Sequence, residues 1–395
     1  MISDNTMPAQ SPKNTHTENA MKVLLAVLLV LLFLPGLTVY AQTPPPDNLV
    51  SPTVNADRTV TFRVRAPKAA QVALYGDWMP VGTQQPMTRD AEGVWSVTAG
   101  PLEATVHLYW FILDGLAIAD PINPILKLRQ RTSASLVEVP SQPAAVWEVK
   151  DVPHGSVEVN WRKSAVLGGS TRQIWVYLPP DYEKNTARRY PILYLLHGSG
   201  DTAAAWTTAG NANIILDNLI AEKKARPMII VMPLGHAVPF GSPPEIQAKN
   251  TPLMEEYMLQ EVLPWAESKY RVMAGRDNHA IAGLSMGGGQ TMNIAFGHLD
   301  LFSQVGVFSS AVGADFEKKY QAVLQNARET NSKLKVFWIG LGDKDNIFSG
   351  ERAKFYFDML KKYGIQHKLR MIPNGAHTWP VWRLCLSEFA PLLFP

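Results

Sequence analysis

The chain has 395 residues, of which 46% are hydrophobic and 18% charged, and its formal net charge is +3 at pH 7. These proportions are ordinary for a globular protein, and so small a positive charge gives no reason to expect a nucleic-acid partner. The length exceeds what one hydrophobic core usually fills, which favours two domains. Cys385 is the only cysteine, which excludes an internal disulfide and a cysteine-based metal cluster within this sequence.

An apolar run near the N-terminus has the length of a signal-peptide core. Residues 23–34 are apolar without interruption, Lys22 supplies a positive charge before them, and Val39-Tyr40-Ala41 offers small residues to a signal peptidase. We therefore expect residues 1–41 to be a signal peptide cleaved after Ala41, with Met21 as an alternative start. The mature protein is expected to be secreted or periplasmic, with no membrane contact after cleavage.

Residues 48–140, which follow an expected linker at 42–47, have the pattern of a small all-β domain. Apolar residues alternate with polar ones from Val60 to Val64, as in a half-buried strand. Short strands at this spacing, divided by turn signals and without helical periodicity, indicate an immunoglobulin-like β-sandwich. Further strands of this domain are predicted at 72–74, 93–97 and 107–113.

After a second expected linker at 141–160, strands and helices alternate through residues 161–395. Repeated βα units predict a mostly parallel sheet with helices on both faces, as in an α/β hydrolase. One helix is expected to begin after Ser349 as its N-cap and to end at Gly364. The predicted strands are 174–178, 192–196, 228–232, 280–283, 305–308, 336–341 and 368–372, and the other predicted helices are 214–221, 254–269 and 286–296.

The run Gly283-Leu284-Ser285-Met286-Gly287 matches the G-x-S-x-G pattern of a nucleophile elbow. It lies between a predicted apolar strand and the start of a predicted helix, which is the context that the motif requires. The two glycines allow a tight turn that raises the serine hydroxyl out of the sheet. We therefore predict that Ser285 is a catalytic nucleophile.

A serine hydroxyl needs a base, and the base needs an acid that orients it. His377 lies in a loop just past the last predicted strand, at the sheet edge where catalytic side chains gather, whereas His298 and His367 occupy a helix end and a strand start. His377 is therefore the predicted base. For the acid, the spacing favours Asp345 over Asp343, which could instead fix the turn through its own backbone bonds.

Two backbone N–H groups are expected to hold the oxyanion of the reaction. One is that of Met286, the residue after the nucleophile, and the other is that of Ser199, in the glycine-bearing turn after the strand at 192–196.

Aromatic side chains lie close to these loops in the sequence. Trp206 and Trp379 are the predicted substrate-binding residues, since flat rings at a pocket rim favour an aromatic or sugar-bearing substrate. For Trp379 a place in the core is an equal alternative, and Trp382 is expected in the core.

The chain contains five motifs in order, among them Tyr194-Leu195-Leu196-His197-Gly198, Ala282 to Gly288 and Gly375-Ala376-His377-Thr378-Trp379. Together they resemble those of the esterase D-type α/β-hydrolases, and most closely those of the feruloyl esterases of carbohydrate esterase family 1. That family usually has Gly-x-x-x-x-Asp in the acid loop, and Gly340 to Asp345 fits this spacing, which strengthens the choice of Asp345. Residues 48–140 contain Arg65-Ala66-Pro67, Gly76-Asp77-Trp78, Gly93-Val94-Trp95 and Asp114-Gly115 followed by Asp120-Pro121. With these features they resemble the N-terminal β-sandwich of such esterases, similar to a family-48 carbohydrate-binding module, and Trp78 and Trp95 are expected in its core. The five motifs are 194–198, 216–221, 228–233, 282–288 and 375–379.

The resemblance implies a feruloyl esterase that releases hydroxycinnamates from plant cell-wall arabinoxylan by a Ser-His-Asp acyl-enzyme mechanism, without metal or cofactor. Its expected partner is a feruloylated polysaccharide or oligosaccharide. An acetyl-xylan esterase and an enterochelin-type siderophore esterase are the nearest alternatives, and the second would favour a basic pocket. An acyltransferase is a further alternative, and a non-catalytic glycan-binding protein is the alternative of another class.

Overall fold

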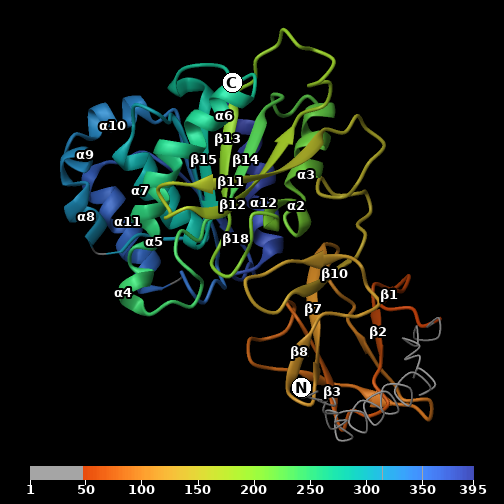
Figure 1. Cartoon of the computed structure of the whole chain (residues 1–395). Coiled ribbons are helices and arrows are strands. Elements are labelled where there is room, and N and C mark those ends of the chain that lie inside the picture. Colours follow the sequence, from red (N-terminus) through yellow and green to blue (C-terminus); the bar gives the residue numbers. More distant parts are fainter. Residues whose placement is uncertain (1–47, 314, 349) are drawn as a thin grey trace, which may run out of the picture. The chain divides into compact units, whose positions relative to one another are not determined.

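The computed structural model describes residues 48–395 apart from Ala314 and Ser349. The predicted signal peptide, its cleavage site and the linker at 42–47 lie outside the described residues. Residues 49–395 form one compact unit, in which an all-β part is followed along the chain by an α/β part (Figure 1). No helix among the described residues is long and apolar enough to cross a lipid bilayer.

The all-β part consists of two antiparallel sheets that share one hydrophobic core, which confirms the predicted sandwich. Trp95 is buried in this core and Trp78 packs against it, as expected. The first sheet has the order β1-β2-β6-β5 and the second β4-β3-β7-β10-β9, with β8 paired to β7. The strands are β1 Thr53–Val54, β2 Val60–Arg65, β3 Val72–Gly76, β4 Gln85–Pro86, β5 Thr88–Arg89, β6 Val94–Ala99, β7 Val106–Leu113, β8 Leu116–Ile118, β9 Leu126–Lys127 and β10 Ala134–Glu138.

Strand β7 is buried on both faces, because successive side chains of a strand point to opposite sides of its sheet. Tyr109 and Phe111 belong to the core of the sandwich. Val106 and Leu108, on the other face, belong to a hydrophobic cluster that includes side chains of the α/β part. The sandwich and the α/β part are therefore joined by shared apolar packing as well as by the chain.

The α/β part is built on an eight-stranded sheet of order β11-β12-β14-β13-β15-β16-β17-β18. The pairs β11–β12 and β12–β14 are antiparallel and the other five pairs are parallel, as predicted for a mostly parallel sheet. The strands are β11 Ser156–Ser164, β12 Ser170–Leu178, β13 Ile192–Leu196, β14 Ile229–Pro233, β15 His279–Leu284, β16 Gln304–Phe308, β17 Val336–Gly342 and β18 Lys368–Ile372.

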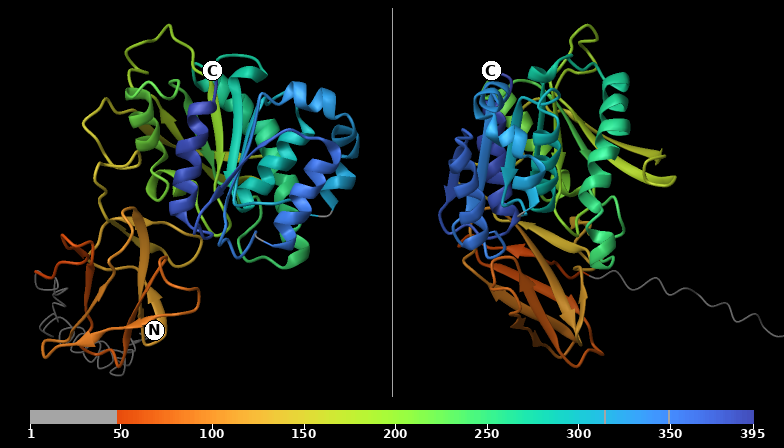
Figure 2. Two further views of the ribbon diagram at one scale, coloured as in Figure 1. Left: turned by 180° about the vertical axis from the view of Figure 1, so that it is seen from behind. Right: turned by 90° about the vertical axis from the view of Figure 1, so that its left-hand side faces the viewer.

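Helices cover both faces of this sheet (Figure 2), because its central strands are apolar on both sides. Side chains of α5, α6, α7 and α11 pack on one face, and those of α2, α3 and α12 pack on the other. A π-helical stretch at Met258–Val262 joins α5 to α6, so the helix predicted at 254–269 is continuous. The helices are α2 Ala205–Thr208, α3 Ala212–Ala221, α4 Pro244–Gln247, α5 Asn250–Tyr257, α6 Leu263–Lys269, α7 Met286–Gly297, α8 Asp315–Lys319, α9 Gln321–Gln325, α10 Ala327–Lys333, α11 Glu351–Tyr363 and α12 Trp379–Phe389, with short 3-10 turns at Arg276–Asn278 and Ala390–Leu392.

One local prediction differs from the structure. Strand β11 begins at Ser156, inside the stretch 141–160 that was expected to be a linker. The predicted N-cap of α11, Ser349, lies outside the described residues, and Gly350 directly precedes the helix. Gly364 ends the helix in the left-handed conformation, as predicted. A glycine at each end supplies a positive φ that other residues rarely adopt.

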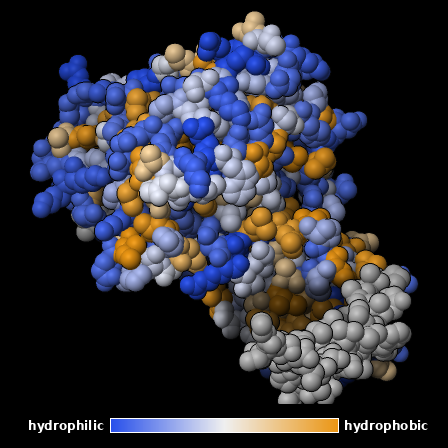
Figure 3. All heavy atoms as spheres, viewed as in Figure 1, coloured by the Kyte–Doolittle hydropathy of each residue, from blue (hydrophilic) through white to orange (hydrophobic). Residues whose placement is uncertain are grey.

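Figure 3 shows one face of the molecule coloured by hydropathy. Hydrophilic residues cover most of the α/β part on that face, and hydrophobic residues are scattered between them. Single apolar residues of this kind are normal on a folded surface.

Candidate active site

Ser285 lies in the turn between β15 and α7, with φ 51° and ψ −118°, a conformation that is unfavourable for any residue other than glycine. The neighbouring glycines leave room for this turn. A Cβ atom on Gly283 would lie 2.4 Å from the carbonyl oxygen of Gly287, and one on Gly287 would lie 2.6 Å from that of Leu196. Both distances are too short for real atoms, so the pattern predicted from the sequence is required sterically.

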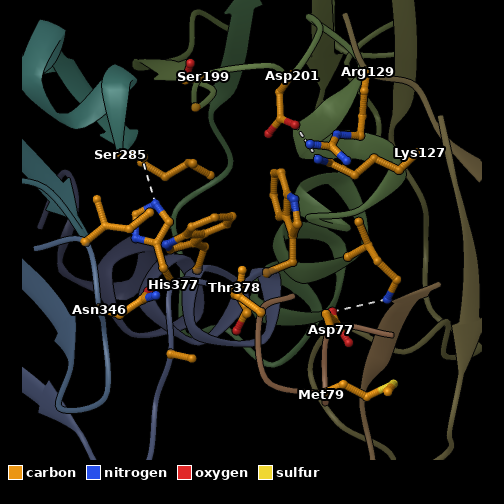
Figure 4. A pocket seen from close by; sticks show the side chains of 18 of the residues that line it. Asp77, Met79, Lys127, Arg129, Ser199, Asp201, Ser285, Asn346, His377 and Thr378 are labelled. Carbon is orange, nitrogen blue, oxygen red and sulfur yellow. Dashed lines mark hydrogen bonds and ion pairs between the residues drawn. The ribbon is translucent and has the colours of Figure 1, made fainter. Parts of the chain in front are cut away.

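The predicted base and acid lie in hydrogen-bond contact with the predicted nucleophile. His377 Nε2 is 3.1 Å from Ser285 Oγ, and His377 Nδ1 is 2.8 Å from Asp345 Oδ2. Figure 4 shows the ring of His377 next to Ser285, with the hydrogen bond between them dashed. The three side chains come from the ends of β15, β17 and β18, which meet at one edge of the sheet.

The side chain of Asp345 is fully buried. Burial alone would raise the pKa of its carboxyl group, but hydrogen bonds from His377 and from two backbone amides outweigh that effect and leave the pKa below its usual value. The two amides are those of Ile347 and Phe348, which donate to Oδ1 at 2.9 Å. Asp343, the other candidate, is exposed, so only Asp345 contacts the histidine.

Ser199 lies beside the nucleophile and lines the same cavity. The loop before it passes close to the elbow, since a Cβ atom on Gly198 would lie 3.4 Å from Cβ of Ser285. Within the described part of the chain, the Ser199 amide donates no hydrogen bond. The amide of Met286 opens α7, where the first N–H groups have no partner inside the helix. Both amides are therefore available to a negatively charged oxygen.

Two buried imidazoles hold the loop that carries Ser199. His197 Nε2 accepts the N–H of Gly235 at 2.8 Å, and His236 Nε2 accepts the N–H of Gly200 at 3.0 Å. Burial lowers the pKa of each ring to about 4. Both rings are neutral at pH 7, which leaves Nε2 free to accept these bonds.

The cavity above Ser285 has a volume of about 670 Å³ and is lined from both parts of the unit. The α/β part contributes the elbow, the histidine loop and the first residues of α12. The sandwich contributes Tyr75 and Trp110, whose rings stack with centroids 4.4 Å apart, together with Leu108, Lys127 and Arg129. The sandwich thus forms one wall of the site.

Of the two predicted substrate-binding tryptophans, only one lines the cavity. Trp379 and Trp382 both line the cavity, and both are buried in the core, so the core alternative for Trp379 and the expectation for Trp382 are confirmed. Trp206 is fully buried and does not line the cavity, so that prediction was wrong. Its indole N–H donates to the carbonyl oxygen of Leu196 at 3.0 Å, and its ring packs edge-on against Trp379. Trp206 therefore supports the cavity wall from behind.

Sequence reasoning missed the residues that the sandwich adds to the site. Tyr75, Trp110 and Lys127 lie on strands β3, β7 and β9, whose alternation shows which residues share a face but not what that face contacts. One signal was available. The run Val106–Leu113 is almost continuously apolar, which is typical of a strand buried on both sides.

Known proteins resemble this chain in sequence. A family model described as putative esterase matches residues 164–392. An endo-1,4-beta-xylanase/feruloyl esterase of Xylanibacter ruminicola is 31% identical over 355 residues, which are 87% of this chain and 46% of that protein. The chain thus spans about half the length of this relative.

Solved structures resemble it in fold. A ferulic acid esterase is 28% identical with a TM-score of 0.51, covering 60% of this chain and 97% of that one. The enterobactin esterase of Shigella flexneri is 20% identical with a TM-score of 0.61, covering 84% of this chain and 92% of that one, and at this identity the likeness concerns the fold alone. The matched region and the α/β-hydrolase fold agree, and the chain belongs to the putative esterase family.

Proposed function

We propose that this protein is an exported serine carboxylesterase that releases hydroxycinnamoyl groups from feruloylated plant cell-wall arabinoxylan. The observation that carries the proposal is the continuous hydrogen-bonded array from Ser285 through His377 to buried Asp345, at the foot of a cavity with aromatic walls. Such an array activates a serine hydroxyl for attack on an ester carbonyl.

In the acylation step, Ser285 Oγ attacks the ester carbonyl carbon while His377 Nε2 takes the hydroxyl proton. Asp345 accepts the N–H of Nδ1 and stabilises the imidazolium that forms. The amides of Ser199 and Met286 donate to the oxyanion of the tetrahedral intermediate, where one such donor is worth about 10²–10³ in kcat. His377 then gives the proton to the departing sugar oxygen, and the acyl group stays on Ser285.

In the deacylation step, water takes the place of the sugar alcohol. His377 removes a proton from the water as it attacks the acyl carbon, and the same two amides hold the second oxyanion. Collapse of this intermediate breaks the bond to Oγ, and His377 returns the proton to Ser285. The products are a free carboxylic acid and the unchanged enzyme.

The proposed acyl group is aromatic because of the size and the walls of the cavity. An acetyl group would fill only a small part of about 670 Å³. The rings of Trp110, Trp379 and Trp382 line the space above Ser285, and aromatic walls of this kind favour a flat aromatic acyl group. The xylanase/feruloyl esterase activity named for the Xylanibacter ruminicola relative is consistent with this choice.

The test compares the full chain with its Ser285→Ala variant on methyl ferulate. We expect the variant to lose nearly all turnover, by a factor of about 10⁴ or more, because the residual groups cannot form the acyl-enzyme. Far-UV circular dichroism controls for folding. Turnover retained by a folded Ser285→Ala variant would end the proposed mechanism.

The substrate class is tested by rates on methyl ferulate, acetylated xylan and enterobactin. The proposal expects the highest kcat/KM on methyl ferulate. Enterobactin is included because a siderophore esterase would favour a basic pocket, and Lys127 and Arg129 line the cavity. A preference for acetylated xylan or for enterobactin would replace the acyl group while keeping the same triad. Export is tested by the N-terminus of protein recovered outside the cytoplasm, which is expected to be Gln42.

A further inference from the structure

A second cavity, of about 300 Å³, lies beside the active-site cavity. Trp110 and Arg129 line both cavities, so the two are neighbours with a shared wall. The remaining lining of the second cavity includes Arg131, Gly200 and Phe240. Gly200 belongs to the turn that carries Ser199, which places this cavity directly behind the proposed oxyanion loop.

The second cavity carries two cationic side chains, Arg129 and Arg131. Both are exposed, and neither forms an ion pair with any acidic residue in the described part of the chain. The acidic side chain near Arg129 is that of Asp201, which is already held by Lys127 in a buried ion pair. Because the charge of Asp201 is balanced by Lys127, no carboxylate in the described residues is left to neutralise Arg129 and Arg131 by an ion pair.

Each arginine also lies near an aromatic ring. The guanidinium of Arg131 is 5.2 Å from the ring centre of Phe240, and that of Arg129 is 5.9 Å from the ring centre of Trp110. Phe240 lies against the backbone of the loop, since a Cβ atom on Gly200 would be 3.4 Å from its ring. Each guanidinium group therefore lies over an aromatic ring, and the cavity wall presents two planar cations backed by apolar side chains.

We propose that this cavity is a subsite for a uronic acid on the glycan that carries the ester. A guanidinium matches a carboxylate with two parallel hydrogen bonds, and the two guanidinium groups line the same small cavity. The volume is at the lower end of ligand pockets, which suits one sugar ring rather than a long chain.

The second cavity lies where a sugar next to the esterified sugar of the glycan would reach. The proposal rests on the proposed function, in which the sugar oxygen leaves from the acyl carbon at Ser285. A glycan that passes across Trp110 and Arg129 would bring a neighbouring acidic sugar into the second cavity. The subsite would then select acidic arabinoxylan over neutral arabinoxylan.

The experiment measures binding without turnover, by isothermal titration of the full-length Ser285→Ala variant. Its ligands are a neutral xylo-oligosaccharide and one of equal length that bears a single glucuronic acid. We expect the acidic ligand to bind about tenfold more tightly at low salt and to lose this advantage as ionic strength rises. Equal affinity for the two ligands would overturn the subsite.

Substitutions test whether Arg129 and Arg131 cause the preference for the acidic ligand. Adding Arg129→Gln and Arg131→Gln together should abolish the preference for the acidic ligand, whereas Arg89→Gln, which removes an exposed arginine elsewhere on the sandwich, should keep it. Thermal melts check that all variants fold. A preference that survives the double substitution contradicts the proposal, and so does its loss in the Arg89 variant.

Two further ligands test whether the cavity binds a free anion rather than the carboxylate of a glycan. Ferulate and inorganic phosphate are titrated into the same variants, and tighter binding of either that depends on Arg129 and Arg131 would assign the cavity to a free anion and overturn the glycan subsite. Turnover of methyl ferulate by the unmodified chain tests the proposed function separately. If the chain does not hydrolyse methyl ferulate but binds the acidic ligand more tightly, the proposed acyl group is wrong and the subsite is supported.

Discussion

The two carboxylate oxygens of Asp345 serve different partners. Oδ2 accepts the N–H of His377, and Oδ1 accepts two backbone amides that fix the loop. Because these bonds leave the pKa of Asp345 below its usual value, the carboxylate is charged throughout the neutral range. It can therefore hold the imidazole in one orientation and stabilise its protonated form during each step.

Replacing Asp345 by Asn should lower kcat on methyl ferulate by about 10³–10⁴, because an amide favours the wrong tautomer of His377. The matched control is Asp343→Asn, which changes an exposed carboxylate two residues away and should alter kcat by less than about threefold. Steady-state kinetics of the two variants measure both changes in kcat. Equal losses in both would mean that the loop, rather than the carboxylate, matters.

His197 and His236 should make the folded state sensitive to acid. Burial lowers the pKa of each ring to about 4, whereas an unfolded histidine titrates near 6.5. Between these values the unfolded chain binds more protons than the folded one, so the free energy of unfolding falls as the pH falls. About one unit above pH 6.5 both states are neutral at these positions, and from there on the two rings add no pH dependence.

Urea unfolding at pH 7.5, 5.5 and 4.5 measures this effect. The His236→Gln variant keeps an acceptor for the N–H of Gly200 but cannot titrate, so its stability should fall less steeply over this range than that of the unmodified chain. Identical slopes for the two proteins would show that His236 does not supply the proton uptake.

At the scale of single residues, local sequence was enough for some positions and not for others. Ser285 and His377 could be predicted because each lies just past a recognisable strand. Trp206 could not be judged, since its burial behind Trp379 depends on how α2 packs against α12. Asp343 and Asp345 were separated by only two positions, and the direction of a loop side chain is set by contacts that periodicity does not record.

At the scale of elements, the turn from β15 to α7 is fixed by what its glycines touch. Gly287 faces the carbonyl oxygens of Leu196 and His197, so α7 lies directly against the end of β13. This contact sets the distance between the elbow and the loop that carries Ser199. The G-x-S-x-G spacing is therefore a packing requirement between two elements as well as a property of one turn.

Two alanine substitutions in α7 should differ sharply. Gly287→Ala would place a methyl group 2.6 Å from backbone oxygens, so we expect a loss of about 1–3 kcal/mol in stability and a large fall in kcat. Gly289→Ala would meet only Ser310 Oγ at 3.8 Å, and it should be tolerated or stabilise the helix by up to about 1 kcal/mol. Melting curves and kcat on methyl ferulate test both, and equal effects would contradict the packing argument.

The elements themselves were predictable to different degrees. The strands at 192–196 and 368–372 and the helix after Ser285 follow from apolar runs and turn signals, and the structure contains them. Strand β11 lies at the edge of the sheet and most of its residues are exposed. Val157, Val159 and Trp161 alternate with polar residues, so a strand signal was present in the stretch that was expected to be a linker. Short strands such as β9 carry too few residues for any pattern.

At the scale of the whole molecule, the sandwich and the α/β part meet at the proposed oxyanion loop. The residues after β9 pair with this loop through an isolated bridge between Arg129 and Asp201 and through the N–H of Gln130, which donates to the carbonyl oxygen of Gly200 at 2.8 Å. Lys127 forms a buried ion pair with Asp201. The domain that could be read from the sequence as a separate module is therefore part of the catalytic framework.

Lys127 links the two proposed catalytic loops. Its ammonium group contacts Asp201, two residues after Ser199, and lies 5.4 Å from the ring centre of Trp379, two residues after His377. Burial lowers the pKa of Lys127 and raises that of Asp201, while their mutual attraction opposes both changes. A buried pair of this kind adds little stability by itself, but the loss of one partner leaves an uncompensated charge.

Lys127→Met should therefore destabilise the protein by about 3–5 kcal/mol. It should also lower kcat on methyl ferulate by at least about tenfold, with a smaller change in KM, because Ser199 would no longer be held for the oxyanion. Adding Asp201→Asn should restore much of the melting temperature but not kcat, and Lys127→Arg should rescue both in part. Lys68→Met, which removes an exposed lysine of the sandwich, is the control. If kcat recovered together with stability in the double variant, Lys127 would have a structural role only.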